Sequence, residues 1–188
     1  MMFEWNSDGV LPPIAPGSAG HDLNRSPYII TMREFIEHFC FSEQRRKILG
    51  GLVSLRKEIY NIGIRNGFQW LDGSFLEDIK TLEDREPNDI DVVTFFTLPD
   101  EIDQASLYNQ NKAIFNHDSV KSLYLVDSYW MPMQKSVNFD FIRRVVYWNS
   151  LWSHRRNGQW KGYVQIPLDY NETNTFMDLL QNSTGGEK

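Results

Sequence analysis

The sequence contains a single cysteine, Cys40, so no disulfide bond can form within the chain. Its four histidines lack the close spacing that zinc sites use. No apolar run approaches the length of a membrane-spanning helix, and the N-terminus shows no basic segment followed by an apolar one. These absences predict a cytoplasmic protein of a reducing compartment, with no membrane association.

Basic charge is also scarce in this chain. Nineteen Lys and Arg residues stand against 25 Asp and Glu residues, which gives a formal net charge of -6. The protein therefore has no overall basic field for nucleic acid or anionic lipid, and a polyanionic ligand needs a local site, with its own cation. Apolar residues make up 41% of the 188 residues, which is enough for one domain with a core.

Composition divides the chain into three parts. Residues 1–30 are rich in Pro, Gly and Ser, which predicts an extended N-terminal arm. We expect this arm to pack on the domain or on a neighbouring subunit through Leu11 and Ile14. A single domain is predicted over residues 31–182, and residues 183–188 are interpreted as a flexible tail.

Hydrophobic periodicity predicts alternating helices and strands within the domain. Helices are expected at residues 42–62, 98–116 and 137–153. Strands are expected at residues 68–72, 88–96, 120–131 and 162–168. This order predicts a mixed α+β domain with a small sheet.

Two aspartates stand one residue apart at the start of the strand predicted over residues 88–96. Side chains two positions apart in a strand point to the same face, so Asp89 and Asp91 can aim both carboxylates at one point. Hard cations such as Mg²⁺ take oxygen ligands, commonly one or two carboxylates together with substrate phosphates. The pair can instead be structural, with both carboxylates accepting hydrogen bonds from turn N–H groups.

A Gly-Ser pair, Gly73-Ser74, follows the strand predicted over residues 68–72. A glycine turn that opens a helix leaves backbone N–H groups free to bind a phosphate, and a serine hydroxyl adds a donor. Gly-Ser and Asp-x-Asp are each common patterns. A strand, this turn, a spacer and then Asp-Ile-Asp at the start of a Val-rich strand is a much rarer order, and it favours a site for a nucleotide and a divalent ion.

This order of motifs resembles the minimal signature of the DNA polymerase beta superfamily of nucleotidyltransferases. The chain also resembles a group of short bacterial nucleotidyltransferase-like proteins, through the segments LPP (11–13), DGSF (72–75), PNDIDVV (87–93) and KGYVQIPL (161–168). Fourteen residues separate Ser74 from Asp89, slightly more than is usual, and we interpret the acidic TLEDRE segment as a tolerated loop insertion. The resemblance implies the polymerase beta-like nucleotidyltransferase fold, with a small mixed sheet and flanking helices.

The resemblance further implies a third carboxylate on a neighbouring strand. Asp127 lies late in the strand predicted over residues 120–131, so an antiparallel arrangement would bring it to Asp89 and Asp91. We assign these three residues as catalytic and as ligands of Mg²⁺ or Mn²⁺, with Asp127 as general base or as ligand of a second ion. Asp140 is the rival third acid, although it lies where a helix is expected to begin.

Two lysines are candidates for binding nucleotide phosphates together with Gly73 and Ser74. Lys80 follows the Gly-Ser turn, where the resemblance favours a lysine, and Lys161 lies in the QWKGYV segment. Each can instead be an ordinary surface lysine.

The most basic stretch of the chain also contains tryptophans. Arginines beside aromatic side chains can bind phosphates and stack bases, although the helical spacing of Trp148 and Trp152 also fits core packing. The stretch contains Arg143, Arg144, Arg155 and Arg156.

These features predict a metal-dependent nucleotidyltransferase that moves a nucleoside monophosphate from an NTP or dNTP to a hydroxyl group. The acceptor stays open: a protein side chain, a small molecule or a nucleotide 3′-OH, the last giving a short untemplated single strand. We expect a protein partner or self-assembly, and the resemblance points to toxin–antitoxin or phage-defence systems. The alternatives are a non-catalytic antitoxin or interaction protein and a nucleotide sensor on the same fold.

Overall fold

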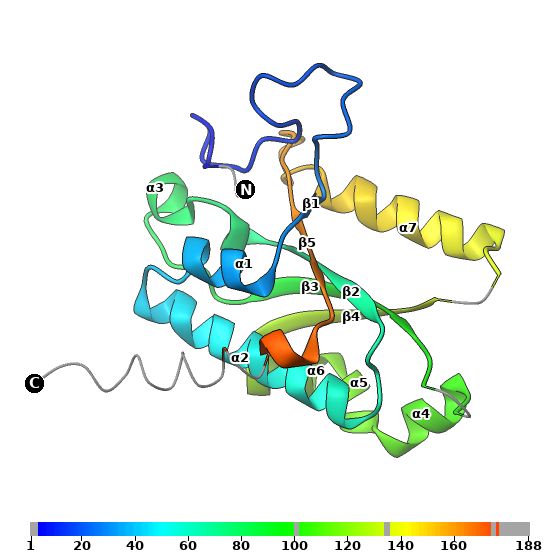
Figure 1. Cartoon of the computed structure of the whole chain (residues 1–188). Coiled ribbons are helices and arrows are strands. Elements are labelled where there is room, and N and C mark those ends of the chain that lie inside the picture. The colour runs from blue at the N-terminus through cyan, green and yellow to red at the C-terminus, as the bar shows by residue number, and fades with distance from the viewer. Residues whose placement is uncertain (1–3, 100–101, 134–135, 174–175, 177–188) are drawn as a thin grey trace, which may run out of the picture.

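A computed structural model describes residues 4–99, 102–133, 136–173 and 176. It contains a five-stranded sheet in the order β1-β5-β2-β3-β4, flanked by helices (Figure 1). The strands are β1 (Tyr28–Ile29), β2 (Gly67–Asp72), β3 (Ile90–Thr97), β4 (Val126–Met133) and β5 (Val164–Pro167). The helices are α1 (Met32–Phe39), α2 (Glu43–Asn61), α3 (Ile79–Glu83), α4 (Gln104–Gln110), α5 (Lys112–Phe115), α6 (His117–Tyr124) and α7 (Phe139–Trp152), with a 3-10 turn, η1 (Ser74–Leu76).

The sheet is mixed, as predicted. β2 pairs antiparallel with both β3 and β5, whereas β3 pairs parallel with β4 and β1 pairs parallel with β5. The α+β class with a small mixed sheet and flanking helices is therefore confirmed. None of the helices in the described part of the chain is long and apolar enough to cross a membrane.

Helix α2 supplies much of the apolar core. Its N-cap, Ser42, accepts a hydrogen bond from the Arg45 N–H at 3.3 Å, which satisfies a free donor of the first turn. The predicted apolar stripe is confirmed by residues with no exposed surface: Ile48, Leu52, Leu55 and Ile59. Burial of this face against the sheet anchors α2 in the position from which it supports the neighbouring helices.

Helix α6 packs closely against α2. A Cβ on Gly51 would overlap the Tyr124 carbonyl, so only glycine lets the two backbones approach this closely. Leu125 then adopts a left-handed conformation with φ of 57°, and β4 begins at the next residue. The prediction of one strand over residues 120–131 was therefore wrong, because its first part is helical.

Other boundaries also differ from the predictions. The helix expected over residues 98–116 is two short helices, α4 and α5, separated at Asn111. Helix α7 matches the expected 137–153 segment, but Val137 lies before it and is 71% exposed. In Figure 1, α7 lies on the opposite side of the sheet from α2.

The N-terminal segment belongs to the core rather than only covering it. Leu11 and Ala15 are buried among the core residues, which confirms the expected packing through Leu11, whereas Ile14 is only half-buried. Strand β1 also lies within residues 1–30, so the sheet begins before the predicted domain boundary at residue 31. The predicted tail, residues 183–188, lies outside the described residues.

Candidate metal and nucleotide site

Three neighbouring strands place aspartates side by side at one end of the sheet. Asp72, the last residue of β2, is opposite Asp91 of β3, and Asp91 is opposite Asp127 of β4. Asp89 immediately precedes β3. The structure thus brings Asp89, Asp91 and Asp127 together, but not in the way expected: β3 and β4 are parallel, and Asp127 is early in its strand. The predicted strand direction and the predicted place of Asp127 within its strand were both wrong, and the two errors together still placed Asp127 at the correct end of the sheet.

The Gly-Ser turn connects β2 to η1 directly beside these acids. Gly73 has φ of 86° and ψ of -174°, a combination that residues with a Cβ rarely adopt. A Cβ at this position would also overlap the Asp91 carboxylate. Glycine is therefore required twice, once by the backbone and once by the carboxylate that lies against it. The element that follows is a three-residue 3-10 turn, shorter than the helix that a phosphate-binding turn was expected to open.

A buried arginine holds the backbone beyond this turn. The Arg45 guanidinium from α2 donates hydrogen bonds to the Phe75 carbonyl at 2.6 Å and to the Glu77 carbonyl at 2.9 Å. Burial lowers the pKa of Arg45 to about 10. These bonds to consecutive parts of the turn fix Gly73 and Ser74 relative to the core.

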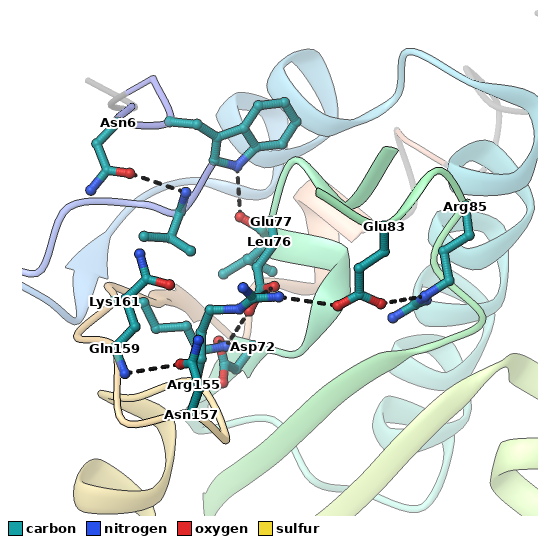
Figure 2. A network of polar contacts seen from close by, with 12 residues as sticks. Asn6, Asp72, Leu76, Glu77, Glu83, Arg85, Arg155, Asn157, Gln159 and Lys161 are labelled. Carbon is teal, nitrogen blue, oxygen red and sulfur yellow. Dashed lines mark hydrogen bonds and ion pairs between the residues drawn. The ribbon is translucent and has the colours of Figure 1, made fainter. Parts of the chain in front are cut away.

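A buried lysine lies behind the turn. The Lys161 ammonium is 2.8 Å from Asp72 Oδ1 and 3.2 Å from Glu77 Oε1, and 6% of its side chain is exposed. Burial raises the pKa of Asp72 to about 7, an effect that Lys161 opposes. Figure 2 shows these side chains as part of a longer chain of contacts in which Arg155 joins Glu77 to Glu83, each at 3.1 Å. Lys161 thus connects Asp72, at the end of β2, to Glu77, which follows η1.

A second lysine lies in front of the sheet. The Lys121 ammonium, from α6, is 2.8 Å from Asp89 Oδ2 and 2.9 Å from Asp127 Oδ2. His117, one helical turn earlier, places Nδ1 at 3.3 Å from Asp127 Oδ1. The hydrogen bonds to Asp89 and Asp127 raise the pKa of Lys121 above its ordinary value. Helix α6 therefore directs two basic groups at the same carboxylate.

Asp91 differs from these acids because no basic side chain in the described part of the chain contacts it directly. It forms no ion pair with any Lys, Arg or His side chain of the described residues. Burial raises its pKa to about 6, and the charges of Asp127 and Asp89 act in the same direction. A partly buried carboxylate pressed between other carboxylates is stabilised by a cation.

The donor set fits a hard divalent ion. Mg²⁺ is commonly held by one or two carboxylates, with water and substrate phosphates completing its coordination, and Asp91 with Asp89 offers such a pair. Within the described part of the chain, no three His, Cys, Asp or Glu side chains form a metal-binding group. Asp89 and Asp91 are the residues that would hold such an ion.

All of these acids line one open cleft with a volume of about 710 Å³. Ser74 and Arg156 also line it, and Arg156 forms no ion pair among the described residues. An aromatic wall closes one side, where the ring centroids of Tyr129 and Trp148 are 4.6 Å apart. The neighbouring Trp152 is 5% exposed. Helix α7 therefore packs against the core and also lines the cleft.

Some predicted site residues lie elsewhere. The Lys80 side chain is 61% exposed and pairs with Asp84 at 2.7 Å, outside the residues that line the cleft. Asp140 is 86% exposed and lies 4.0 Å from Arg143, also outside the cleft. Asp127 therefore lines the cleft, whereas Asp140 and Lys80 do not.

Sequence reasoning missed the two residues that set the charge of the site. No sequence pattern singles out Asp72, although it directly precedes the Gly-Ser pair and ends a buried strand. Lys121 was hidden by the prediction of a strand over residues 120–131. A helix predicted over residues 117–124 would have placed His117 and Lys121 four residues apart on one face.

Residues 3–167 match the family model described as a family of unknown function, DUF6932. No curated protein matches the chain, and no solved structure matches it.

Proposed function

The chain belongs to the DUF6932 family, and we propose that it is a divalent-metal-dependent nucleotidyltransferase with a polymerase beta-like fold. The observation that carries this proposal is the position of Asp91. Its carboxylate lacks an ion pair among the described residues and lies against Gly73 of the Gly-Ser turn. In the sheet, Asp91 is flanked by Asp72 of β2 and Asp127 of β4. Asp91 and Asp89 would hold a divalent ion beside the turn, where it would neutralise the charge of a bound phosphate.

The nucleoside triphosphate occupies the open cleft. Its phosphates lie at the Gly73-Ser74 turn, where the Ser74 hydroxyl and the Arg156 guanidinium donate hydrogen bonds. Its base stacks against the aromatic wall at Trp148. The three-residue turn has little helix dipole, so cationic groups replace the phosphate binding that a longer helix would provide.

The reaction is the attack of a hydroxyl oxygen on the α-phosphorus, with release of pyrophosphate. Asp89 and Asp91 would hold a Mg²⁺ or Mn²⁺ ion, which would supply positive charge to stabilise the phosphates during the attack. Asp127 stands next to the attacking hydroxyl and accepts its proton. Arg45 and Lys161 hold the turn and its neighbouring strand in place, so positioning and charge account for most of the rate acceleration.

The acceptor hydroxyl comes from outside the cleft. A partner protein, a second copy of the chain or a nucleotide 3′-OH can bring it, and the last gives a short untemplated oligonucleotide. A role in toxin–antitoxin regulation or phage defence follows only from the resemblance of the motifs.

The test is transfer of label from each α-labelled NTP and dNTP in the presence of Mg²⁺ or Mn²⁺, with and without cell lysate. We expect label on a protein or on a growing oligonucleotide. The double variant Asp89→Ala, Asp91→Ala should abolish transfer, whereas Asp140→Ala, outside the cleft, should retain it. No transfer with any nucleotide, or transfer that survives the double variant, contradicts the proposal.

A nucleotide sensor is the second candidate, because Lys121 already neutralises part of the charge of Asp89 and Asp127. Asp127→Ala separates the two functions. In an enzyme the variant still binds nucleotide and loses turnover. In a sensor the wild type binds nucleotide and transfers nothing, and the variant behaves as the wild type does.

A further inference from the structure

The Lys121 ammonium occupies a position between two of the proposed metal ligands. Its nitrogen is 2.8 Å from an oxygen of Asp89 and 2.9 Å from an oxygen of Asp127. These distances are those of charge-assisted hydrogen bonds. The cation therefore joins the acid before β3 to the acid of β4, in front of the strand that carries Asp91.

Enzymes that use two divalent ions for phosphoryl displacement place one ion near the attacking oxygen and the other near the leaving oxygens. Both ions share carboxylates from the same small group of acids. In this chain the ammonium takes one oxygen of each of the two outer acids, and His117 faces the other oxygen of Asp127 at 3.3 Å. Lys121 thus binds one oxygen of Asp127, whereas the other, Oδ1, lies near His117 without forming a hydrogen bond. Asp91 forms an ion pair with neither Lys121 nor His117.

We propose that Lys121 takes the place of one of the two divalent ions, so that the cleft binds a single ion, at Asp91 and Asp89. This inference rests on the proposed function, because it assigns a role within that site. One ammonium and one divalent ion together carry three positive charges, which balance the carboxylates of Asp89, Asp91 and Asp127. A second divalent ion would have to displace the ammonium from both outer acids.

The surroundings of Lys121 fit this role better than a purely structural one. Its side chain is 44% exposed, and the Asp89 and Asp127 side chains are 24% and 14% exposed. An ion pair at an open cleft adds little to stability. Lys80 offers the matched comparison, since its side chain is 61% exposed and also forms a close ion pair, with Asp84, but away from the cleft.

The experiment counts the ions that bind to the metal-free full-length chain. Free Mn²⁺ is measured by electron paramagnetic resonance during a titration of the wild type and of Lys121→Met, Lys121→Arg and Lys80→Met. We expect one Mn²⁺ per wild-type chain, one for Lys121→Arg, which keeps the charge, and one for Lys80→Met. Lys121→Met should bind two, because removal of the ammonium frees oxygens of both outer acids. Circular dichroism and melting temperature confirm that each variant is folded, and Lys121→Gln gives a second neutral variant.

The inference is overturned by a count of two for the wild type, or by an unchanged count of one for both neutral variants. A wild-type count of two with intact nucleotidyl transfer removes only the role of Lys121. A count of zero for the wild type overturns the inference as well, and together with the absence of label transfer it also removes the proposed function.

Discussion

Two lysines in this protein each form ion pairs with two carboxylates. Comparing them distinguishes an ion pair that stabilises the fold from one that belongs to the proposed site. Lys161 bridges Asp72 and Glu77 at 2.8 and 3.2 Å, and Lys121 bridges Asp89 and Asp127 at 2.8 and 2.9 Å. The distances are alike, but 6% of the Lys161 side chain is exposed against 44% of the Lys121 side chain. Solvent access, rather than contact geometry, distinguishes the two bridges.

The energetic consequences of this difference are large. A buried charge that loses its partner is left in a medium that solvates it poorly, so breaking a buried pair is costly. An open pair competes with water and contributes little. We therefore regard the Lys161 bridge as part of the fold and the Lys121 bridge as part of the site, where its cation can be exchanged without unfolding the chain.

The largest effect should come from the buried bridge. Lys161→Met leaves the buried Asp72 carboxylate without its cation, whereas Glu77 keeps Arg155 at 3.1 Å. We expect this change to lower the free energy of unfolding by about 3–5 kcal/mol. Lys121→Met, the matched change in the more exposed bridge, should lower the free energy of unfolding by less than Lys161→Met does. Urea denaturation of both variants measures the difference. Equal losses would show that exposure does not separate the two bridges.

The charge of Asp91 should also have a measurable effect on the free energy of unfolding. Its folded pKa is about 6 against an ordinary value of 3.8, so the folded state binds a proton more tightly than the unfolded state does. The destabilisation caused by the ionised Asp91 carboxylate is therefore fully present above pH 6. It decreases as the pH falls and is absent below the ordinary pKa of 3.8.

Asp91→Asn removes this cost. Without divalent ions at pH 8, we expect the variant to be more stable than the wild type by up to about 3 kcal/mol. The advantage should decline between pH 6 and pH 4, where the wild-type carboxylate takes up its proton. Thermal melts across this pH range provide the measurement, and an advantage that does not change with pH would argue against the raised pKa.

The smallest of these effects concerns the turn. Gly73→Ala places a Cβ in a backbone conformation that suits glycine almost alone, at a cost of roughly 1–3 kcal/mol. The same Cβ displaces the Asp91 carboxylate, so Mg²⁺-dependent nucleotide binding should fall further than stability does. Melting temperature and nucleotide affinity, measured on the same sample, show whether the two losses differ. Loss of stability with unchanged affinity would mean that the turn does not set the position of Asp91.

The local parts of the site could be predicted from the sequence because they are short and carry their own signals. Gly73, Ser74, Asp89 and Asp91 lie within one strand–turn–strand unit, where the strand period alone directs both carboxylates to one face. The apolar stripe of α2 was predicted for the same reason, since its spacing matches the helical repeat.

The remaining parts depend on contacts between distant segments. At the end of α6 the left-handed position is occupied by Leu125 rather than by glycine. The sequence therefore carries no glycine or proline signal for the helix end, and residues 120–131 were predicted as one strand. The ion pairs of Lys121 were lost with that error. The role of Lys161 depends on packing against Asp72, 89 positions earlier in the chain, for which a single sequence carries no signal.

The central claim is that a divalent ion at Asp91 links the cleft to nucleotide phosphates. Equilibrium dialysis of a labelled, non-hydrolysable NTP analogue tests it most directly, with wild type, Asp91→Asn and the exposed control Asp140→Asn, each with and without Mg²⁺. We expect binding that requires Mg²⁺ in the wild type and in the control, and loss of that binding in Asp91→Asn. Binding that is independent of Mg²⁺, or that survives in Asp91→Asn, would contradict the account.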